Sequence, residues 1–263
     1  MLWEELTSKN FEKALEQAKG TCVIPFGVIE KHGQHLPLGT DMYAARKFAI
    51  DAAEIEPVVI FPYYCFGQIN EARHVPGTIS VTPSIMYSLL EEICNEISRN
   101  GFKKIIILNS HGGNTQFVNY FIQSILHANR DYVVYNVSCY LPEEDKDTMI
   151  KSIGTDDWGS HAENLETSMM MAIIPELVKM DDVEMEGINA YGKLNHLPGV
   201  YTPVSWYANH PTHFAGDPFK ANPESGKLAF ELSAKSIAKN IKAIKEDDMA
   251  LQLQDEFYAK TNM

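Results

Sequence analysis

Short apolar runs alternate along this chain with longer segments in which apolar residues recur every three or four positions. Four runs have the length and composition of buried strands: TCVIPFGVI at 21–29, PVVIF at 57–61, KKIIILN at 103–109 and DYVVYNVSC at 131–139. Segments with helical spacing precede and separate them, at 11–19, 41–55, 83–100 and 115–129. This alternation predicts an α/β fold of three layers (α/β/α), with a largely parallel central sheet and helices on both faces.

The chain has no internal repeat or low-complexity linker, so we expect a single domain over residues 1–263. A length of 263 residues, 45% of them hydrophobic, is enough to bury a large core. Two segments, 62–83 and 185–222, are rich in Gly, Pro, His and aromatic residues, and we expect them to form walls or lids of a pocket. The last stretch, 246–263, fits either a C-terminal helix or a tail.

Acidic residues outnumber basic ones, with 35 Asp and Glu against 22 Lys and Arg, for a net charge of −13. This balance argues against nucleic acid or an anionic membrane as a partner. The start, MLWEELTSKNFEKALEQ, lacks the basic and apolar regions of a signal peptide, and no stretch approaches the length of a membrane span. We therefore expect a cytoplasmic protein whose four separated cysteines are buried, reduced thiols.

Potential metal ligands follow two of the predicted strands. Glu30 and His32 come after the first strand, and residues two apart on an extended backbone project to the same side. Asp41 stands at the head of the next helix. His111 follows the strand at 103–109, with two glycines after it that allow a close approach of the backbone to a ligand. Because ligands gather at the carboxyl ends of parallel strands, these four side chains are expected to converge.

The donors in this set are nitrogen and oxygen without cysteine, which suits catalytic Zn²⁺, Mn²⁺ or Fe²⁺ rather than structural zinc. A further cluster, SHAENLETS at 160–168, has His161 and Glu166 at the head of an apolar helix. His161 can serve there as an acid or base, and Glu166 can complete a coordination shell. Three carboxylates are more than one catalytic ion normally uses, which favours two ions with a bridging Asp.

Taken together, four blocks resemble the creatininase (creatinine amidohydrolase) family: PFGVIEKHGQHLPLGTD at 25–41, VPGTIS at 75–80, NSHGGN at 109–114 and HAENLETS at 161–168. The resemblance implies a homo-oligomeric enzyme, a hexamer by family, with a dinuclear metal centre that hydrolyses carbon–nitrogen bonds in amides. It implies that Glu30 and His111 hold one ion, that His32 holds the other, and that Asp41 bridges them. His161 matches the family's catalytic histidine.

The chain departs from the family pattern at two positions. Creatininases proper carry a glutamate ligand where this chain has Gly113, so the resemblance makes Glu166 the expected replacement, as in relatives with the H-G-G-N form. That form is shared with deformylases of formamidopyrimidine intermediates and with peptidase-like enzymes of peptide-cofactor maturation. Glu163 stands where relatives usually have glycine, and we expect it either to face solvent or to change the charge of the pocket.

These patterns predict a metal-dependent hydrolase acting on a non-peptide C–N bond of a small cyclic amide or formamide. Two divalent ions per chain, Zn²⁺ or Mn²⁺ with Fe²⁺ as a further candidate, would activate water and polarise the carbonyl. His161 and Glu166 are the expected catalytic residues, and His161 would deliver a proton to the departing nitrogen. The alternative hypothesis is a catalytically degenerate member that binds metal as a sensor or assembly protein, for which Gly113 is the only hint.

Other conspicuous side chains receive lesser roles. His35 is expected to orient its loop rather than bind metal, and Met169, Met170 and Met171 are expected in the core. The oxyanion would be stabilised by Ser110, Asn114 or the backbone of Gly112 and Gly113. Aromatic residues expected at the pocket wall or an oligomer interface are Tyr63, Tyr64, Trp158, Trp206 and Tyr207. Histidines expected to be ordinary surface or core residues are His74, His127, His196, His210 and His213.

Overall fold

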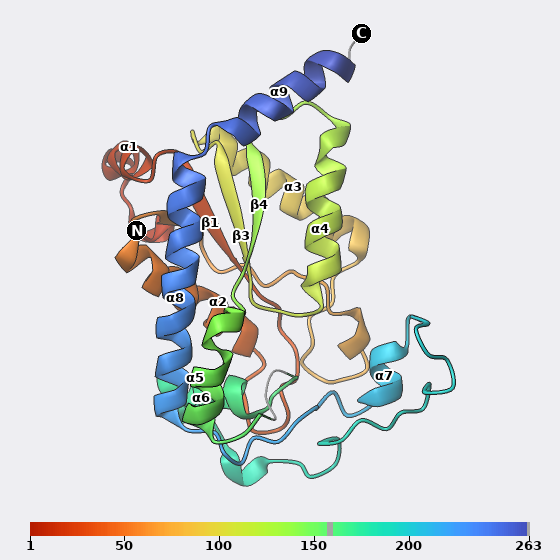
Figure 1. Cartoon of the computed structure of the whole chain (residues 1–263). Helices are drawn as coiled ribbons and strands as arrows, with labels where there is room; N and C mark the ends of the chain where they lie inside the picture. The colour runs from red at the N-terminus through yellow and green to blue at the C-terminus, as the bar shows by residue number, and fades with distance from the viewer. Residues whose placement is uncertain (157–159, 262–263) are drawn as a thin grey trace.

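A four-stranded parallel sheet lies at the centre of the computed structural model, which describes residues 1–156 and 160–261 (Figure 1). The strand order is β2-β1-β3-β4, with bounds β1 (Thr21–Phe26), β2 (Val59–Ile60), β3 (Lys104–Asn109) and β4 (Val133–Ser138). β1 and β3 pair along their whole length, from Thr21 opposite Lys104 to Phe26 opposite Asn109. The predicted parallel sheet is confirmed.

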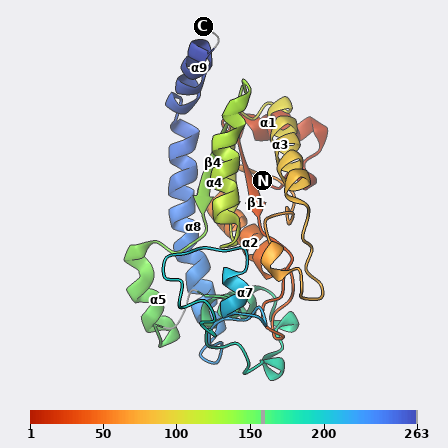
Figure 2. The same ribbon diagram turned by 90° about the vertical axis from the view of Figure 1, so that its right-hand side faces the viewer.

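Both faces of the sheet are apolar, because successive residues of a strand point to opposite sides. Val23 and Ile106 face a core shared with α2 (Thr40–Ile55), α5 (Lys146–Ile153), α6 (Asn164–Ile173) and α8 (Pro223–Glu246). Ile24 and Ile105 face a second core, shared with α1 (Ser8–Gln17), α3 (Pro83–Arg99) and α4 (Asn114–Ser124). Figure 2 shows α8 and α3 on opposite sides of the strands, so the expected three layers are also confirmed.

The helix α8 is not among the segments predicted from hydrophobic spacing, although its start carries a clear signal. The side chain of Asn222 caps it by accepting a hydrogen bond from the backbone N–H of Ser225 at 2.8 Å, and Pro223 occupies the first turn. Gly226 packs directly on α6, because a Cβ there would stand 2.0 Å from the carbonyl oxygen of Ser168. This close contact packs α6 against α8.

The C-terminal stretch forms a helix, α9 (Met249–Thr261), rather than a tail. The Tyr258 hydroxyl is buried and donates a hydrogen bond to the carbonyl oxygen of Ala128 at 2.6 Å. The Gln254 amide donates to the carbonyl oxygens of Arg130 and Tyr132, each at 2.9 Å. These contacts dock α9 at the end of the sheet where β4 begins.

Several predicted boundaries differ from those observed. β1 ends at Phe26 because the N–H of Gly27 already donates to Tyr64, outside the sheet. β2 is an edge strand of two residues, and the predicted helix at 115–129 is α4 followed by a 3-10 turn. The remaining short helices are α7 (Ser205–Asn209) and 3-10 turns at Trp3–Glu5, Asn70–Ala72, Ile125–His127, Glu143–Asp145, Pro175–Leu177 and Met180–Asp182. Among the described residues, no helix is long and apolar enough to cross a membrane.

Candidate metal centre

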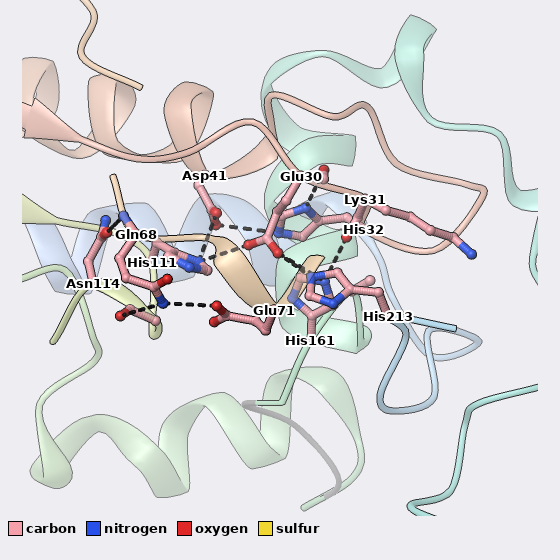
Figure 3. A network of polar contacts seen from close by, with 12 residues as sticks. Glu30, Lys31, His32, Asp41, Gln68, Glu71, His111, Asn114, His161 and His213 are labelled. Carbon is pink, nitrogen blue, oxygen red and sulfur yellow. Dashed lines mark hydrogen bonds and ion pairs between the residues drawn. The ribbon is translucent and has the colours of Figure 1, made fainter. Parts of the chain in front are cut away.

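The predicted ligands meet at the carboxyl ends of β1 and β3 (Figure 3). Gly27, directly after β1, lets the first turn of α2 lie against the strand end, because a Cβ there would stand only 2.7 Å from the backbone nitrogen of Met42. Asp41 is in that turn. On the β3 side, the side chain of Asn109 pins His111 through hydrogen bonds to its backbone, at 3.0 Å to the carbonyl oxygen and 3.2 Å from the N–H. Local backbone contacts therefore aim both elements at one point.

Glu30, Asp41 and His111 form the first group of potential ligands, and all three are buried. The Nδ1 atom of His111 lies 2.8 Å from Oε1 of Glu30 and 3.1 Å from Oδ2 of Asp41. The other oxygen of Glu30 points away from this group. Three ligand atoms that come from a strand end, a helix start and a second strand end thus share one small space.

His32, His161 and Glu166 form a second group beside the first. The Nε2 atom of His32 lies 3.7 Å from Oε2 of Glu166 and 3.4 Å from Oδ1 of Asp41, so Asp41 presents one oxygen to each group. The ring of His161 lies 4.3 Å from that of His32, centroid to centroid. The Nε2 atom of His161 is 2.7 Å from the carbonyl oxygen of Lys31, to which it donates in the neutral ring.

The negative charge of the buried carboxylates in the site is offset by the neighbouring histidines. Burial alone would raise the pKa of Glu30, but the charge of His111 and hydrogen bonds from His111 and His213 hold it well below its usual range. Burial would likewise lower the pKa of His32 and His111, yet their neighbouring carboxylates raise it, to about 10 for His32. Burial, with the charge of His32, lowers the pKa of His161 to about 3, whereas burial raises that of Glu166 to about 7. The carboxylates therefore draw positive charge into a buried space.

Buried polar atoms without hydrogen-bond partners also indicate that this set of side chains fits divalent cations. Apart from the histidine–carboxylate contacts given above, Oε1 of Glu30, Nε2 of His32 and Oδ2 of Asp41 are buried without a hydrogen-bond partner within the part of the chain that the structure describes. Buried polar atoms are nearly always satisfied, and each such atom left unpaired costs about 1–3 kcal/mol. All three belong to the two ligand groups, so cations bound there would satisfy them together.

His213 is a member of the site that the sequence analysis assigned to ordinary positions. It is 2% exposed, and its Nε2 donates a hydrogen bond to Oε2 of Glu30. With Glu30 and His161 it forms a third group of potential ligand atoms. The only sequence feature that pointed to His213 was its position in the irregular segment 185–222. His210 shares that position, so the feature could not identify His213.

The two departures from the family pattern have structural answers. A Cβ at Gly113 would stand 2.5 Å from Nε2 of His111 and 2.8 Å from Oε1 of Glu71, so the carboxylate of Glu71 fills the space beside His111. Glu71 comes from the segment 62–83, and its Oε2 accepts a hydrogen bond from the side chain of Gln68 at 2.9 Å. Glu163 is 1% exposed and caps α6, accepting from backbone N–H groups of the first turn. Of the two alternatives for Glu163, exposure to solvent is therefore wrong.

A cavity of about 1010 Å³ opens over the site, and both irregular segments contribute to its wall through Glu71, Tyr201 and Trp206. The cavity is also lined by Glu30, His111, His161 and Glu166. Of the aromatic residues named from the sequence, only Trp206 among the described residues lines this cavity. Tyr64 is buried against Phe26, Tyr63 lies beside Arg46, and Tyr207 packs on His74. Trp158 lies outside the described residues.

The other residues named from the sequence surround the site. His35 is buried and its Nε2 lies 3.0 Å from the Thr167 hydroxyl, which ties its loop to α6. The Asn114 side chain accepts from the N–H of Gln68 at 2.7 Å and holds the segment 62–83, while Ser110, Gly112 and Gly113 line the cavity. Met169 and Met170 are in the core, and Met171 is half-buried. The histidines left exposed are His74, His127 and His196.

Comparison with known proteins gives a consistent result. A family model named creatininase, with the description creatinine amidohydrolase, matches residues 4–241. The chain is 26% identical over 259 residues to a creatinine amidohydrolase of Pseudomonas putida, covering 90% of this chain and 95% of the relative. It is 28% identical to a mycofactocin precursor peptide peptidase of Mycolicibacterium smegmatis, covering 61% of each. It is 25% identical to a 3-dehydro-scyllo-inosose hydrolase of Thermotoga maritima, covering 84% of this chain and 72% of the relative.

Solved structures share the fold. A structure described as creatininase Mn matches with a TM-score of 0.78 at 22% identity, covering 94% of this chain and 99% of that chain. A mutant creatininase of Zn–Zn type matches with a TM-score of 0.76 at the same identity, covering 94% of this chain and 98% of that chain. The three layers around the parallel sheet are therefore a known architecture.

Proposed function

The chain belongs to the creatininase (creatinine amidohydrolase) family of hydrolases, and we propose that it is a metal-dependent amidohydrolase that cleaves a C–N bond of a small cyclic amide or formamide. The observation that carries this proposal is the convergence of Glu30, His32, Asp41, His111 and Glu166 on one buried space. The relatives' names span creatinine, a precursor peptide and an inosose, so family membership alone does not define the substrate.

Two divalent cations, Zn²⁺ or Mn²⁺ with Fe²⁺ as a further candidate, match the two groups of ligand atoms. Glu30 and His111 would hold one, His32 and Glu166 the other, and Asp41 would contribute an oxygen to each. When bound, such ions lower the pKa of a water molecule and polarise a carbonyl group. Structural neighbours described as Mn and Zn–Zn forms support this choice of metals.

We assign to His161 the proton transfer that amide cleavage requires. Its Nε2–H donates to the carbonyl oxygen of Lys31, so in the neutral ring Nδ1 is the atom that accepts a proton. Burial keeps the ring neutral before reaction. His161 would take a proton from the attacking water and pass it to the departing nitrogen. Ser110 and the backbone N–H groups of Gly112 and Gly113, on the cavity wall, are the candidates for stabilising the oxyanion.

Metal analysis followed by a hydrolysis screen tests the proposal. Protein purified without chelator, and again after dialysis with Mn²⁺ or Zn²⁺, should contain about two ions per chain by elemental analysis. Cyclic amides and formamides should then be screened, because a formamide releases formate whereas a lactam opens to an amino acid. The variant His161→Ala should keep its metal and lose most turnover. Metal binding without hydrolysis of any compound would favour the sensor or assembly role, and no metal would refute both.

We also propose a homo-oligomer that acts in the cytoplasm on a small-molecule amide. Large apolar side chains remain exposed along the segment 185–222, which supports contact with another copy: Tyr191, Leu197, Val200, Tyr201 and Val204. Light scattering on the purified protein should give a mass of at least two chains of 29.6 kDa each. A monomeric mass would refute the assembly.

A further inference from the structure

A directed chain of hydrogen bonds leads from the cavity wall to Glu30. The indole Nε1–H of Trp206 donates to Nδ1 of His213 at 2.9 Å. An indole N–H can only donate, so Nδ1 of His213 must be the acceptor and carries no proton. The proton of the neutral ring is therefore on Nε2, which donates to Oε2 of Glu30. Trp206 thus selects the tautomer that lets His213 hold the carboxylate.

The conformation of His213 shows that its surroundings hold it in place. Its φ of +57° lies in the left-handed region, which is strained for a residue with a Cβ and persists only where neighbours enforce it. The ring is 2% exposed and lies 5.8 Å from the Trp206 ring and 4.8 Å from the His161 ring, centroid to centroid. The backbone N–H of His213 donates to the carbonyl oxygen of His210 at 3.0 Å. The strained turn aims the imidazole at Glu30.

The two oxygens of Glu30 consequently have separate partners. Oε2 accepts from His213, whereas Oε1 faces Nδ1 of His111 at 2.8 Å, within the first ligand group. We propose that His213 is a positioning residue that orients Glu30 toward the cation, with its tautomer selected by Trp206. This inference rests on the proposed function, because it assumes that Glu30 binds metal.

A positioning role explains the contacts of His213 better than direct coordination. Although Nε2 of His213 lies near Glu30 and His161, that atom carries the ring's proton, and the lone pair of Nδ1 is engaged by Trp206. Neither nitrogen is left to bind a cation. Partners of this kind typically change metal affinity by about 10–100-fold when they are removed. Since Trp206 also lines the cavity, a substrate that moves the indole would act on Glu30 through His213.

Two amide substitutions separate the two hydrogen bonds of His213. In His213→Gln, the side-chain NH₂ can occupy the place of Nε2 and still donate to Glu30. In His213→Asn, the shorter amide reaches only the place of Nδ1, so Trp206 keeps its acceptor and Glu30 loses its donor. The matched control is His196→Gln, on the same irregular segment but exposed.

The measurement is Mn²⁺ affinity of the metal-free protein by competition with a chromogenic chelator, together with ions per chain and the unfolding midpoint of the apo form. His213→Asn should bind Mn²⁺ about 10–100-fold more weakly. His213→Gln should lie much closer to the wild type, His196→Gln should match it, and all should saturate with the same number of ions. Residue-assigned nitrogen-15 NMR of the wild-type imidazoles should show the proton of the His213 ring on Nε2, which tests the tautomer even if a variant fails to fold.

The outcomes separate this inference from the proposed function. Wild-type metal binding with equal affinities in both His213 variants would overturn the positioning role alone. Loss of a whole ion from both variants would also overturn it, because His213 would then be a ligand. A proton on Nδ1 would overturn the role assigned to Trp206. A wild-type chain that takes up no Mn²⁺ or Zn²⁺ would refute the proposed function and this inference together.

Discussion

The substitution Gly27→Ala tests whether close backbone packing positions the proposed metal ligands. An added Cβ would stand 2.7 Å from the backbone nitrogen of Met42 and 2.8 Å from the carbonyl carbon of Asp41. Ordinary contact begins at 3.4 Å, so the start of α2 must retreat by about 0.7 Å. Metal–ligand distances tolerate about 0.2 Å, so a shift of this size would take the Asp41 carboxylate out of range of the proposed cations.

The expected cost follows from the same distances. Both clashing atoms belong to the backbone, which cannot rotate away as a side chain can. Overpacking of this kind costs about 1–3 kcal/mol. For a chain of this length, each kcal/mol lowers the unfolding midpoint by about 2–4 °C, so a decrease of roughly 2–12 °C is expected. Metal affinity should fall as well, by at least about tenfold.

Thermal unfolding of the apo and Mn²⁺-loaded protein, with elemental analysis, provides the assay. The control is Gly39→Ala, at the N-cap of the same helix, where the added Cβ meets only side-chain atoms of Tyr43 and Met42, the nearest at 3.1 Å. That variant should keep both its metal and its midpoint within a few degrees. If Gly27→Ala matched the wild type in metal content and midpoint, close packing at the end of β1 would not be what positions Asp41.

Three further predictions test individual residues. Asp41→Ala should lose more metal per chain than a variant that lacks a ligand of only one ion, because the two Asp41 oxygens face both groups of ligand atoms. Full metal content of Asp41→Ala by elemental analysis would contradict this. Glu163→Ala should lower the free energy of unfolding by about 1 kcal/mol through loss of a helix cap while keeping its metal, whereas Glu166→Gln should lose metal with little change in stability. Urea titration measures the stability of the two variants, and elemental analysis measures their metal content. Metal loss in Glu163→Ala with lower stability in Glu166→Gln would contradict these roles. Because burial raises the pKa of the Cys22 and Cys94 thiols, iodoacetamide at pH 8 should label neither in the folded protein by mass spectrometry; fast labelling would show that they are accessible.

Much of the ligand set was predictable from local sequence. Glu30 and His32 follow one apolar run and His111 follows another, and the carboxyl ends of parallel strands meet at one edge of a sheet. Knowing that the runs were strands was therefore sufficient to place these side chains together. Asp41 could be added because it begins the helix after the first strand.

His213 and Glu71 could not be found in this way. Both belong to irregular segments, where no period of 2 or 3.6 residues tells which side chains face inward. His213 reaches Glu30 across 183 positions of sequence, through a turn of positive φ that its residue type does not demand. For Glu163 the sequence left two alternatives open, because its capping hydrogen bonds depend on where α6 begins.

The sequence by itself determined the parallel sheet, its helical layers and the four side chains at strand and helix ends, because hydrophobic period and strand direction are local properties. Only the tertiary structure decided how the two irregular segments close over the site, and with them the placement of Trp206, His213 and Glu71. The physical reason is that loops without a repeating pattern take their conformation from the surfaces they pack against, and those surfaces exist only after the sheet and helices have assembled.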